Sequence, residues 1–168
     1  MKHILILGDR GAGKSTLIRR LLKLTSLPLF GFFTKKEDTF PYSVYLWPAS
    51  APEDKVVAVT FSCTSHNVNL KAFNELGAQS ISRAEGNRGL IVMDELGFLE
   101  SKASVFTESV LKALDGDIPI LAAVKNRSEV PFLEAVLKHP KAQVFIITSE
   151  NREDLYKELA PVVSGLSL

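Results

Sequence analysis

Short runs of apolar residues, each followed by a polar turn, divide the chain into segments of strand-like or helix-like length. Ile4–Leu7 and Leu90–Met93 are unbroken apolar runs, which is typical of strands covered on both faces. Residues 14–24 instead carry leucines at helical spacing, and Asn69 is expected to cap a later helix. The pattern predicts strands over 2–7, 29–34, 42–47, 56–61, 90–93, 118–124 and 142–148, and helices over 14–24, 69–85, 102–114, 129–138 and 152–163.

The order of these elements predicts an α/β fold. From residue 88 onward strands alternate with helices, which indicates a largely parallel sheet flanked by helices on both faces. Residues 29–63 carry three strands with turns and no helix between them, so these strands should be antiparallel neighbours. We therefore expect a three-layer sandwich whose mostly parallel sheet has an antiparallel extension from residues 29–63. The length suits a single domain, 1–168.

The first strand runs directly into a phosphate-loop pattern, Gly-x-x-x-x-Gly-Lys-Ser/Thr. At such a strand-to-helix junction, backbone N–H groups curl around an anion, and the helix adds its positive dipole end. Lys14 should reach the β- and γ-phosphates, and the Ser15 hydroxyl should hold Mg²⁺. The fold class is thus that of the P-loop NTPases. The predicted nucleotide-binding residues of the loop are Gly8, Asp9, Arg10, Gly11, Ala12, Gly13, Lys14, Ser15 and Thr16.

The apolar run Leu90–Met93 ends in two carboxylates, which is the pattern of a Walker-B strand. The carboxyl end of a buried strand lies at the crevice where open α/β sheets bind ligands. There Asp94 is predicted to bind Mg²⁺, and Glu95 to orient or deprotonate the attacking water. Glu100 either lines the nucleotide site or begins the next helix, where the dipole favours an acid. The sequence leaves these two interpretations of Glu100 open.

Two further strand ends carry candidate residues. Hydrolysis needs positive charge beyond Lys14, and Arg127, after the strand 118–124, is the leading candidate for a second catalytic cation. An ordinary solvated loop arginine explains Arg127 as well. Asn151 and Arg152 follow the last strand and could flank the nucleotide base, with the guanidinium stacked on it. Alternatively, Asn151 caps the last helix.

The composition of the chain limits the classes of partner and the compartment that we expect. The formal charge of +1 gives no basic excess, so no nucleic-acid partner is expected. Nowhere do eighteen apolar residues come together, so no membrane association is expected. Because Cys63 is the single cysteine, no internal disulfide forms and a reducing, cytoplasmic location is the expectation. The expected partner is a nucleoside triphosphate, and the oligomeric state stays open.

Four segments together resemble the small P-loop nucleoside-triphosphatase family first described in thermophiles, whose animal member is called cancer-related nucleoside-triphosphatase. The segments occur in the family's order and span nearly the whole chain. They are GDRGAGKSTLI from Gly8, GFFTKKE over Gly31–Glu37, MDELGFLE over Met93–Glu100 and TSENREDL over Thr148–Leu155.

The resemblance implies that several nucleoside triphosphates are hydrolysed to diphosphate and phosphate, with little base preference and with Mg²⁺ required. It places Gly8–Ser15 around the phosphates, and Asp94 and Glu95 beside the metal and the water. Glu100 matches the family's terminal glutamate in the Walker-B segment. Residues 38–68 match the family poorly.

Two other functions use the same loop. A nucleotide or small-metabolite kinase would pass the γ-phosphoryl to an acceptor hydroxyl, and such kinases usually carry an Arg-rich lid. The comparable stretch here, Lys125–Arg127, is short. A nucleotide-dependent switch is a third candidate, although Ser149–Arg152 stands where a guanine-specific Asn-Lys-x-Asp loop would be expected.

Overall fold

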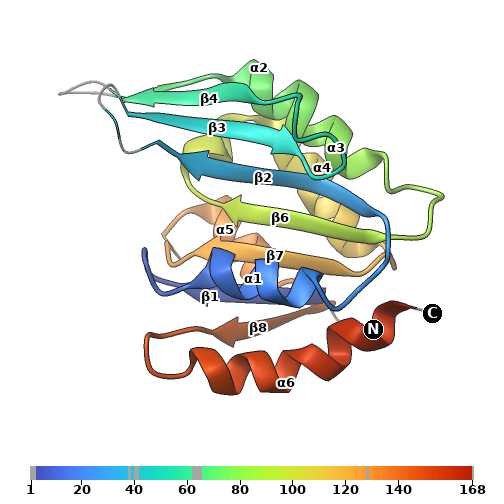
Figure 1. Cartoon of the computed structure of the whole chain (residues 1–168). Coiled ribbons are helices and arrows are strands. Elements are labelled where there is room, and N and C mark those ends of the chain that lie inside the picture. The colour runs from blue at the N-terminus through green and yellow to red at the C-terminus, as the bar shows by residue number, and fades with distance from the viewer. Residues whose placement is uncertain (1–2, 38, 40–41, 62–65, 128, 168) are drawn as a thin grey trace.

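One mixed sheet organises the molecule (Figure 1). The computed structural model describes residues 3–37, 39, 42–61, 66–127 and 129–167, and Cys63 lies outside them. In this part of the chain eight strands pair in the order β5-β4-β3-β2-β6-β7-β1-β8. The strands are β1 His3–Gly8, β2 Leu29–Lys36, β3 Ser43–Pro48, β4 Val56–Phe61, β5 His66–Val68, β6 Leu90–Leu96, β7 Ile120–Lys125 and β8 Ala142–Ile146.

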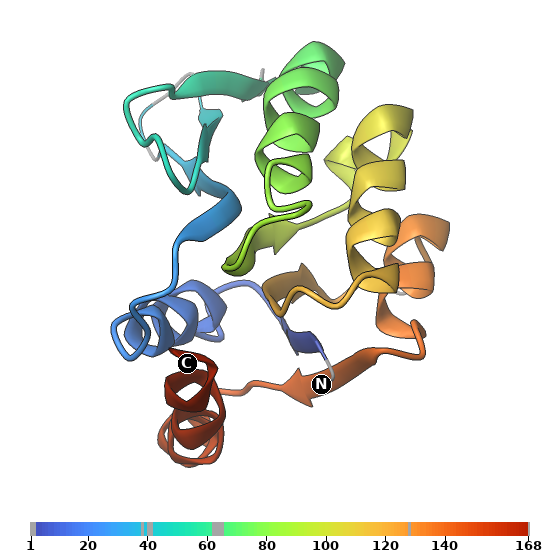
Figure 2. The ribbon, with the colours of Figure 1, turned by 90° about the vertical axis from the view of Figure 1, so that its right-hand side faces the viewer.

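Helices cover both faces of the sheet (Figure 2). One face packs against α1 and α6, the other against the helical stretch from α2 to α5. The helices are α1 Lys14–Leu22, α2 Leu70–Ala72, α3 Ala78–Ser82, α4 Ser104–Asp115, α5 Pro131–Leu137 and α6 Arg152–Ser164; a π-helical turn spans Phe73–Gly77, and 3₁₀ turns span Leu99–Lys102 and Gly165–Ser167. The predicted three-layer α/β fold is therefore confirmed. Within the described residues, no helix combines the length and the apolar character needed to cross a bilayer.

Strand direction brings the candidate site residues to one edge. Strands β2, β6, β7, β1 and β8 are mutually parallel, so their carboxyl ends share the edge marked by the arrowheads in Figure 1. The pairs β2–β3 and β3–β4 are antiparallel, as predicted for the extension, and β4 pairs antiparallel with β5, a strand that was not predicted. The short strand β5 lengthens this extension beyond residue 63.

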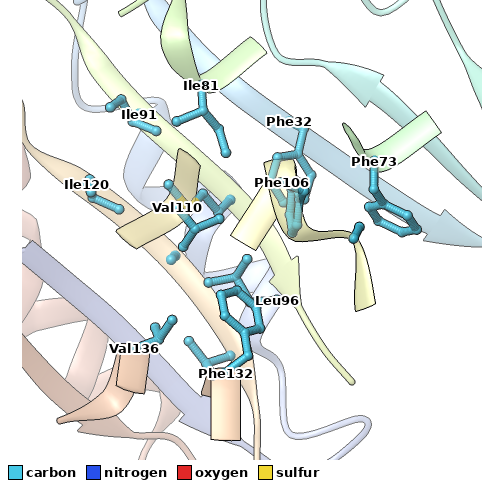
Figure 3. Close-up of a cluster of buried hydrophobic side chains, with 14 of the residues drawn as sticks. Phe32, Phe73, Ile81, Ile91, Leu96, Phe106, Val110, Ile120, Phe132 and Val136 are labelled. Atoms are coloured by element: carbon cyan, nitrogen blue, oxygen red, sulfur yellow. The ribbon is translucent and has the colours of Figure 1, made fainter. Parts of the chain in front are cut away.

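The larger core lies between the sheet and α3, α4 and α5, and Phe106 is at its centre (Figure 3). The Phe106 ring makes edge-to-face contacts with Phe32 and Phe73, each with 5.4 Å between ring centroids. A third edge-to-face contact, at 6.4 Å, joins Phe106 to Phe132. These contacts tie strand β2, the π-helical turn and two helices together behind the functional edge.

Two predicted elements differ from the structure by more than two residues at one end. Strand β6 continues to Leu96, because Asp94 still pairs with Phe33 of β2 and with Ala123 of β7. The predicted helix 69–85 begins at its expected cap, since the Asn69 side chain accepts a hydrogen bond from the Ala72 N–H at 3.1 Å. It is then interrupted by the π-helical turn Phe73–Gly77 and ends at Ser82.

Gly31 allows β2 to lie against β6. Its φ is +85°, and a Cβ built there would be 1.9 Å from the Val92 carbonyl oxygen. The Gly31 carbonyl also accepts a hydrogen bond from the Ala49 N–H at 2.8 Å. A side chain at this position would be strained at this φ and would overlap the backbone of β6.

We expect Gly31→Ala to lower the free energy of unfolding by more than about 3 kcal/mol, because strained φ and backbone overlap add. Gly86→Ala is the matched control, since Gly86 has a φ of +75° with nothing within 4 Å of its added Cβ. That variant should lose only about 1 kcal/mol. Urea unfolding of both variants measures the difference, and equal losses would contradict the steric explanation.

Candidate active site

The phosphate loop connects β1 to α1 and has its expected backbone form. Gly11 and Gly13 have φ values of +77° and +107°, and the Ala12 N–H donates to the Asp9 carbonyl at 3.2 Å. The Lys14 side chain is only 6% exposed. Its ammonium donates to the Gly8 and Asp9 carbonyls at 2.7 and 2.9 Å. The ammonium therefore lies against the loop, where phosphate oxygens can replace the carbonyls as its partners.

Arg152 binds two backbone carbonyls of the phosphate loop. Its Nε donates to the Ala12 carbonyl at 2.6 Å, and its Nη2 donates to the Gly11 carbonyl at 2.9 Å. A Cβ on Gly13 would lie 2.9 Å from the Arg152 Nε. With two of its carbonyls bound by Arg152, the loop is held in a conformation that can present N–H groups to an anion.

Asn151 closes the turn between β8 and α6 and does not cap the helix with its side chain. Its Oδ1 accepts from the Thr148 N–H, and its Nδ2 donates to the Ile146 carbonyl, both at 2.8 Å. Asn151 is thus the N-cap residue of α6 by position, as the alternative interpretation has it, but its side chain makes no capping hydrogen bond. Contacts of Asn151 and Arg152 with a base stay a prediction.

The Walker-B carboxylate meets the loop. Asp94 is 1% exposed, and its Oδ1 accepts a hydrogen bond from the Ser15 hydroxyl at 2.8 Å. Its Oδ2 is buried with no hydrogen-bond partner among the described residues. Burial, together with the neighbouring Glu95 carboxylate, raises the pKa of Asp94 to about 6, although the Ser15 hydroxyl opposes the change.

The Ser15 and Asp94 pair fits Mg²⁺. An unpartnered carboxylate oxygen beside a hydroxyl is a suitable start for a coordination shell that water and phosphate oxygens complete. No group of three or more His, Cys, Asp or Glu side chains in the described part of the chain is arranged to hold a metal. A complete protein cage is not what Mg²⁺ requires, because it keeps several waters and binds through one or two carboxylates plus phosphates.

Glu95 lies between two lysines. Its Oε2 is 3.6 Å from the Lys14 ammonium, and its Oε1 is 3.4 Å from the Lys125 ammonium. From β2, the Thr34 hydroxyl donates to the Asp94 carbonyl at 3.1 Å and accepts from the Glu95 N–H at 3.2 Å. Thr34 therefore fixes the backbone that carries both carboxylates. Sequence reasoning missed Thr34 and Lys125 as site residues, although each stands at or near a strand's carboxyl end.

A cavity of about 770 Å³ joins these groups. Glu100 lines it, is 5% exposed and accepts a hydrogen bond from the Gly97 N–H. Burial raises the pKa of Glu100, although that hydrogen bond opposes the change. Glu100 thus lies in the cavity wall and also in the first turn of the 3₁₀ segment Leu99–Lys102, so the structure is compatible with both interpretations. The described lining residues are Gly8, Asp9, Arg10, Gly11, Gly13, Lys14, Ser15, Thr16, Arg19, Thr34, Lys35, Lys36, Val44, Val59, Phe73, Asp94, Glu95, Gly97, Phe98, Leu99, Glu100, Lys125, Asn126 and Arg127.

Arg127 lines the cavity at a more exposed position. Its Nε donates to the Glu129 carboxylate, and its guanidinium carbon is 4.5 Å from the centre of the Phe98 ring. The neighbouring Asn126 donates to the Asp9 carboxylate at 3.2 Å, which links the end of β7 to the phosphate loop. A catalytic role for Arg127 stays a prediction.

Comparisons with known proteins decide the family. A family model described as NTPase matches residues 51–160. The nucleoside-triphosphatase THEP1 of Thermotoga maritima is 30% identical over 169 residues, a match that covers 95% of this chain and 94% of that protein. The chain belongs to this nucleoside-triphosphatase family. The resemblance inferred from the four sequence segments is therefore confirmed.

Other members extend the likeness over the full fold. The nucleoside-triphosphatase THEP1 of Methanocaldococcus jannaschii is 27% identical, covering 98% of this chain and 99% of that protein. The crystal structure of THEP1 from the hyperthermophile Aquifex aeolicus superimposes with a TM-score of 0.80 at 24% identity, covering 96% of this chain and 98% of that chain. This superposition shows that the three-layer fold is shared.

The buried charge of Asp94 should make the ligand-free protein less stable as the pH rises. Its pKa is raised in the folded state, so the protonated form is favoured there, and that stability is lost as the pH rises through about 6. The wild type should therefore lose roughly 1 kcal/mol between pH 5 and pH 8 from this group.

Asp94→Asn removes that titration. Melting temperatures are measured without nucleotide or Mg²⁺. The difference between the variant and the wild type should increase by about 3 °C in favour of the variant from pH 5 to pH 8. Asp117→Asn is the control, because Asp117 is exposed and Lys141 lowers its pKa. Its difference from the wild type should stay flat over this range. A flat difference for Asp94→Asn as well would contradict the raised pKa.

Proposed function

We propose that this protein hydrolyses nucleoside triphosphates to diphosphate and phosphate with Mg²⁺ as cofactor. The observation that carries the proposal is the 2.8 Å contact between Ser15 and Asp94, with the second Asp94 oxygen buried and unpartnered beside the phosphate loop. Chemistry at a phosphoryl group depends on positioning and on neutralising charge, and the residues around this contact supply both. Family membership supports the same reaction class.

Binding would begin at the loop. N–H groups from the loop and the first turn of α1 would receive the phosphate oxygens, and Lys14 would exchange the Gly8 and Asp9 carbonyls for them. Mg²⁺ held by Ser15 and Asp94 would neutralise charge on the β- and γ-phosphates. Arg152 would keep the loop in shape during this exchange, because its partners are the Gly11 and Ala12 carbonyls, which Lys14 does not bind.

Glu95 is the group proposed to act on water. It is 26% exposed, lines the cavity and is anchored through its own N–H by Thr34. Its carboxylate would accept the proton of a water whose oxygen bonds to the γ-phosphorus as the bond to the β–γ bridging oxygen breaks. Lys14 would stabilise the charge that develops on the phosphoryl oxygens.

We further propose that ATP, GTP and other triphosphates are accepted and that the reaction takes place in the cytoplasm. The groups proposed above to bind substrate all serve the phosphates, which every nucleoside triphosphate has. The family resemblance implies the same low base preference, and the single cysteine of the chain suits a reducing compartment.

Transfer to an acceptor other than water is the second candidate. The cavity continues past Asp94 and Glu95 along β2, β3 and β4, where Lys35, Val44 and Val59 line it. That space could receive a small acceptor hydroxyl compound beside the γ-phosphate.

One panel tests both functions. Phosphate release is measured from ATP, GTP, CTP and UTP with Mg²⁺, with EDTA, and with nucleosides or sugars added as acceptors. We expect release from all four triphosphates, loss of release in EDTA, and no phosphorylated acceptor. Acceptor phosphorylation faster than phosphate release would identify a kinase, and base-selective turnover would contradict the proposed substrate range.

Two variants separate binding from chemistry. Lys14→Ala should weaken triphosphate binding and abolish most turnover, because the ammonium supplies charge directly to the phosphates. Glu95→Gln should keep the dissociation constant of a fluorescent triphosphate within about threefold while lowering kcat at least about 100-fold. Lys112→Met is the control, since Lys112 pairs with Glu85 outside the cavity. Lost binding in Glu95→Gln would point to a structural role for Glu95.

A further inference from the structure

Strand β7 ends between the two halves of the nucleotide site. In the sheet order β6-β7-β1, it separates the strand that carries the carboxylates from the strand that enters the phosphate loop. On one side Lys125 is in register with Gly8, and on the other Ala123 is in register with Asp94. A polar side chain at the carboxyl end of β7 therefore lies between the loop and the carboxylates. That position is occupied by Lys125.

Lys125 and Lys14 share Glu95 between them. Each oxygen of the Glu95 carboxylate faces a different ammonium, at 3.4 Å for Lys125 and 3.6 Å for Lys14. The two lysines differ in what else they bind, because the Lys14 ammonium also donates to carbonyls of the loop. If phosphate oxygens replaced these partners of Lys14, Glu95 would still pair with Lys125, and the Lys125 ammonium would lie beside the attacking water and the γ-phosphoryl.

The Walker-B segment leaves room for the Lys125 side chain. A Cβ on Gly97 would lie 3.3 Å from the Lys125 Cδ, which is closer than most real contacts. The Phe98 ring borders the ammonium, with 5.6 Å between Nζ and the ring centroid. The lysine stem thus passes over a glycine and beside an aromatic ring, which limits the positions its ammonium can take.

Arg127 is placed differently. Its guanidinium stacks on Phe98 and binds Glu129, and its side chain is 48% exposed compared with 37% for Lys125. Glu95 has ion pairs with Lys14 and Lys125. Of the two cations at the end of β7, Lys125 contacts Glu95, whereas Arg127 binds Glu129.

We propose that Lys125 is a catalytic cation of the hydrolysis proposed above, on which this inference rests. Its ammonium donates to a γ-phosphoryl oxygen while the water oxygen bonds to phosphorus and the bond to the bridging oxygen breaks. Glu95 takes the water's proton, and the diphosphate leaves with the electron pair of the broken bond. Because charge on the phosphoryl oxygens is greatest in the transition state, this contact acts on kcat more than on substrate binding.

The test compares Lys125→Met, which keeps length and removes charge, with the wild type and with Lys125→Arg. For each we measure kcat and KM of Mg²⁺-dependent phosphate release, and the dissociation constants of ADP alone and of ADP with aluminium fluoride, a mimic of the transferring phosphoryl. Lys125→Met should lose about 100-fold in kcat and a similar factor in affinity for the aluminium fluoride complex, with ADP affinity unchanged. Lys125→Arg should recover at least a tenth of the lost kcat, because it restores the charge.

Two further variants set the comparison. Lys112→Met should match the wild type throughout, and Arg127→Met should lose less kcat than Lys125→Met. The proposal is overturned if Lys125→Met keeps kcat within about threefold of the wild type, or if Arg127→Met loses more. Failure of both Lys125→Met and Lys125→Gln to bind ADP would also overturn it, since the lysine would then serve the fold. A wild type that releases no phosphate would instead refute the hydrolase function itself.

Discussion

The site depends on the contact between the phosphate loop and the Walker-B carboxylates, and the hydrogen bond between Ser15 and Asp94 makes this contact beside the Lys14–Glu95 ion pair. The Ser15 hydroxyl and the Asp94 carboxylate meet at 2.8 Å although they are separated by 79 positions in sequence. The contact lies at the edge of the sheet core, where a carboxylate is costly because burial disfavours its charged form. The fold tolerates this cost because the apolar clusters on both faces of the sheet are large and well packed. Such a local conflict is expected where a protein prepares to bind a cation.

The phosphate loop, the Walker-B pair and the fold class could be predicted because each has a local signature. A glycine-rich stretch between an apolar run and a helix, or two acids at the end of such a run, carries its own physical reason. The antiparallel extension was predictable for a similar reason, since three strands without intervening helices can only return as neighbours. These signals require no knowledge of which strands lie side by side.

Thr34 and Lys125 could not be predicted in this way. Both residues contact β6 from a neighbouring strand, Thr34 from β2 and Lys125 from β7. The sequence does not show that β7 lies between β6 and β1 or that β2 pairs with β6. Arg127 was the more conspicuous residue because arginine suits phosphoryl chemistry, yet the end of the strand falls at Lys125. Asn151 and Arg152 match a helix start in sequence. Only the tertiary structure shows that their side chains close the preceding turn and brace the loop.

The contacts of Arg152 with the phosphate loop have a consequence for the order in which the chain folds during synthesis. The central strand β1 is completed by β7 on one side and β8 on the other, and the loop after β1 is secured by the first residue of α6. During synthesis, the glycine-rich loop leaves the ribosome long before the partners that shape it. A growing chain that lacks α6 has the glycine-rich loop but lacks the two hydrogen bonds that Arg152 donates to it. The contacts of Arg152 with the loop therefore form only after α6 has packed beside the sheet.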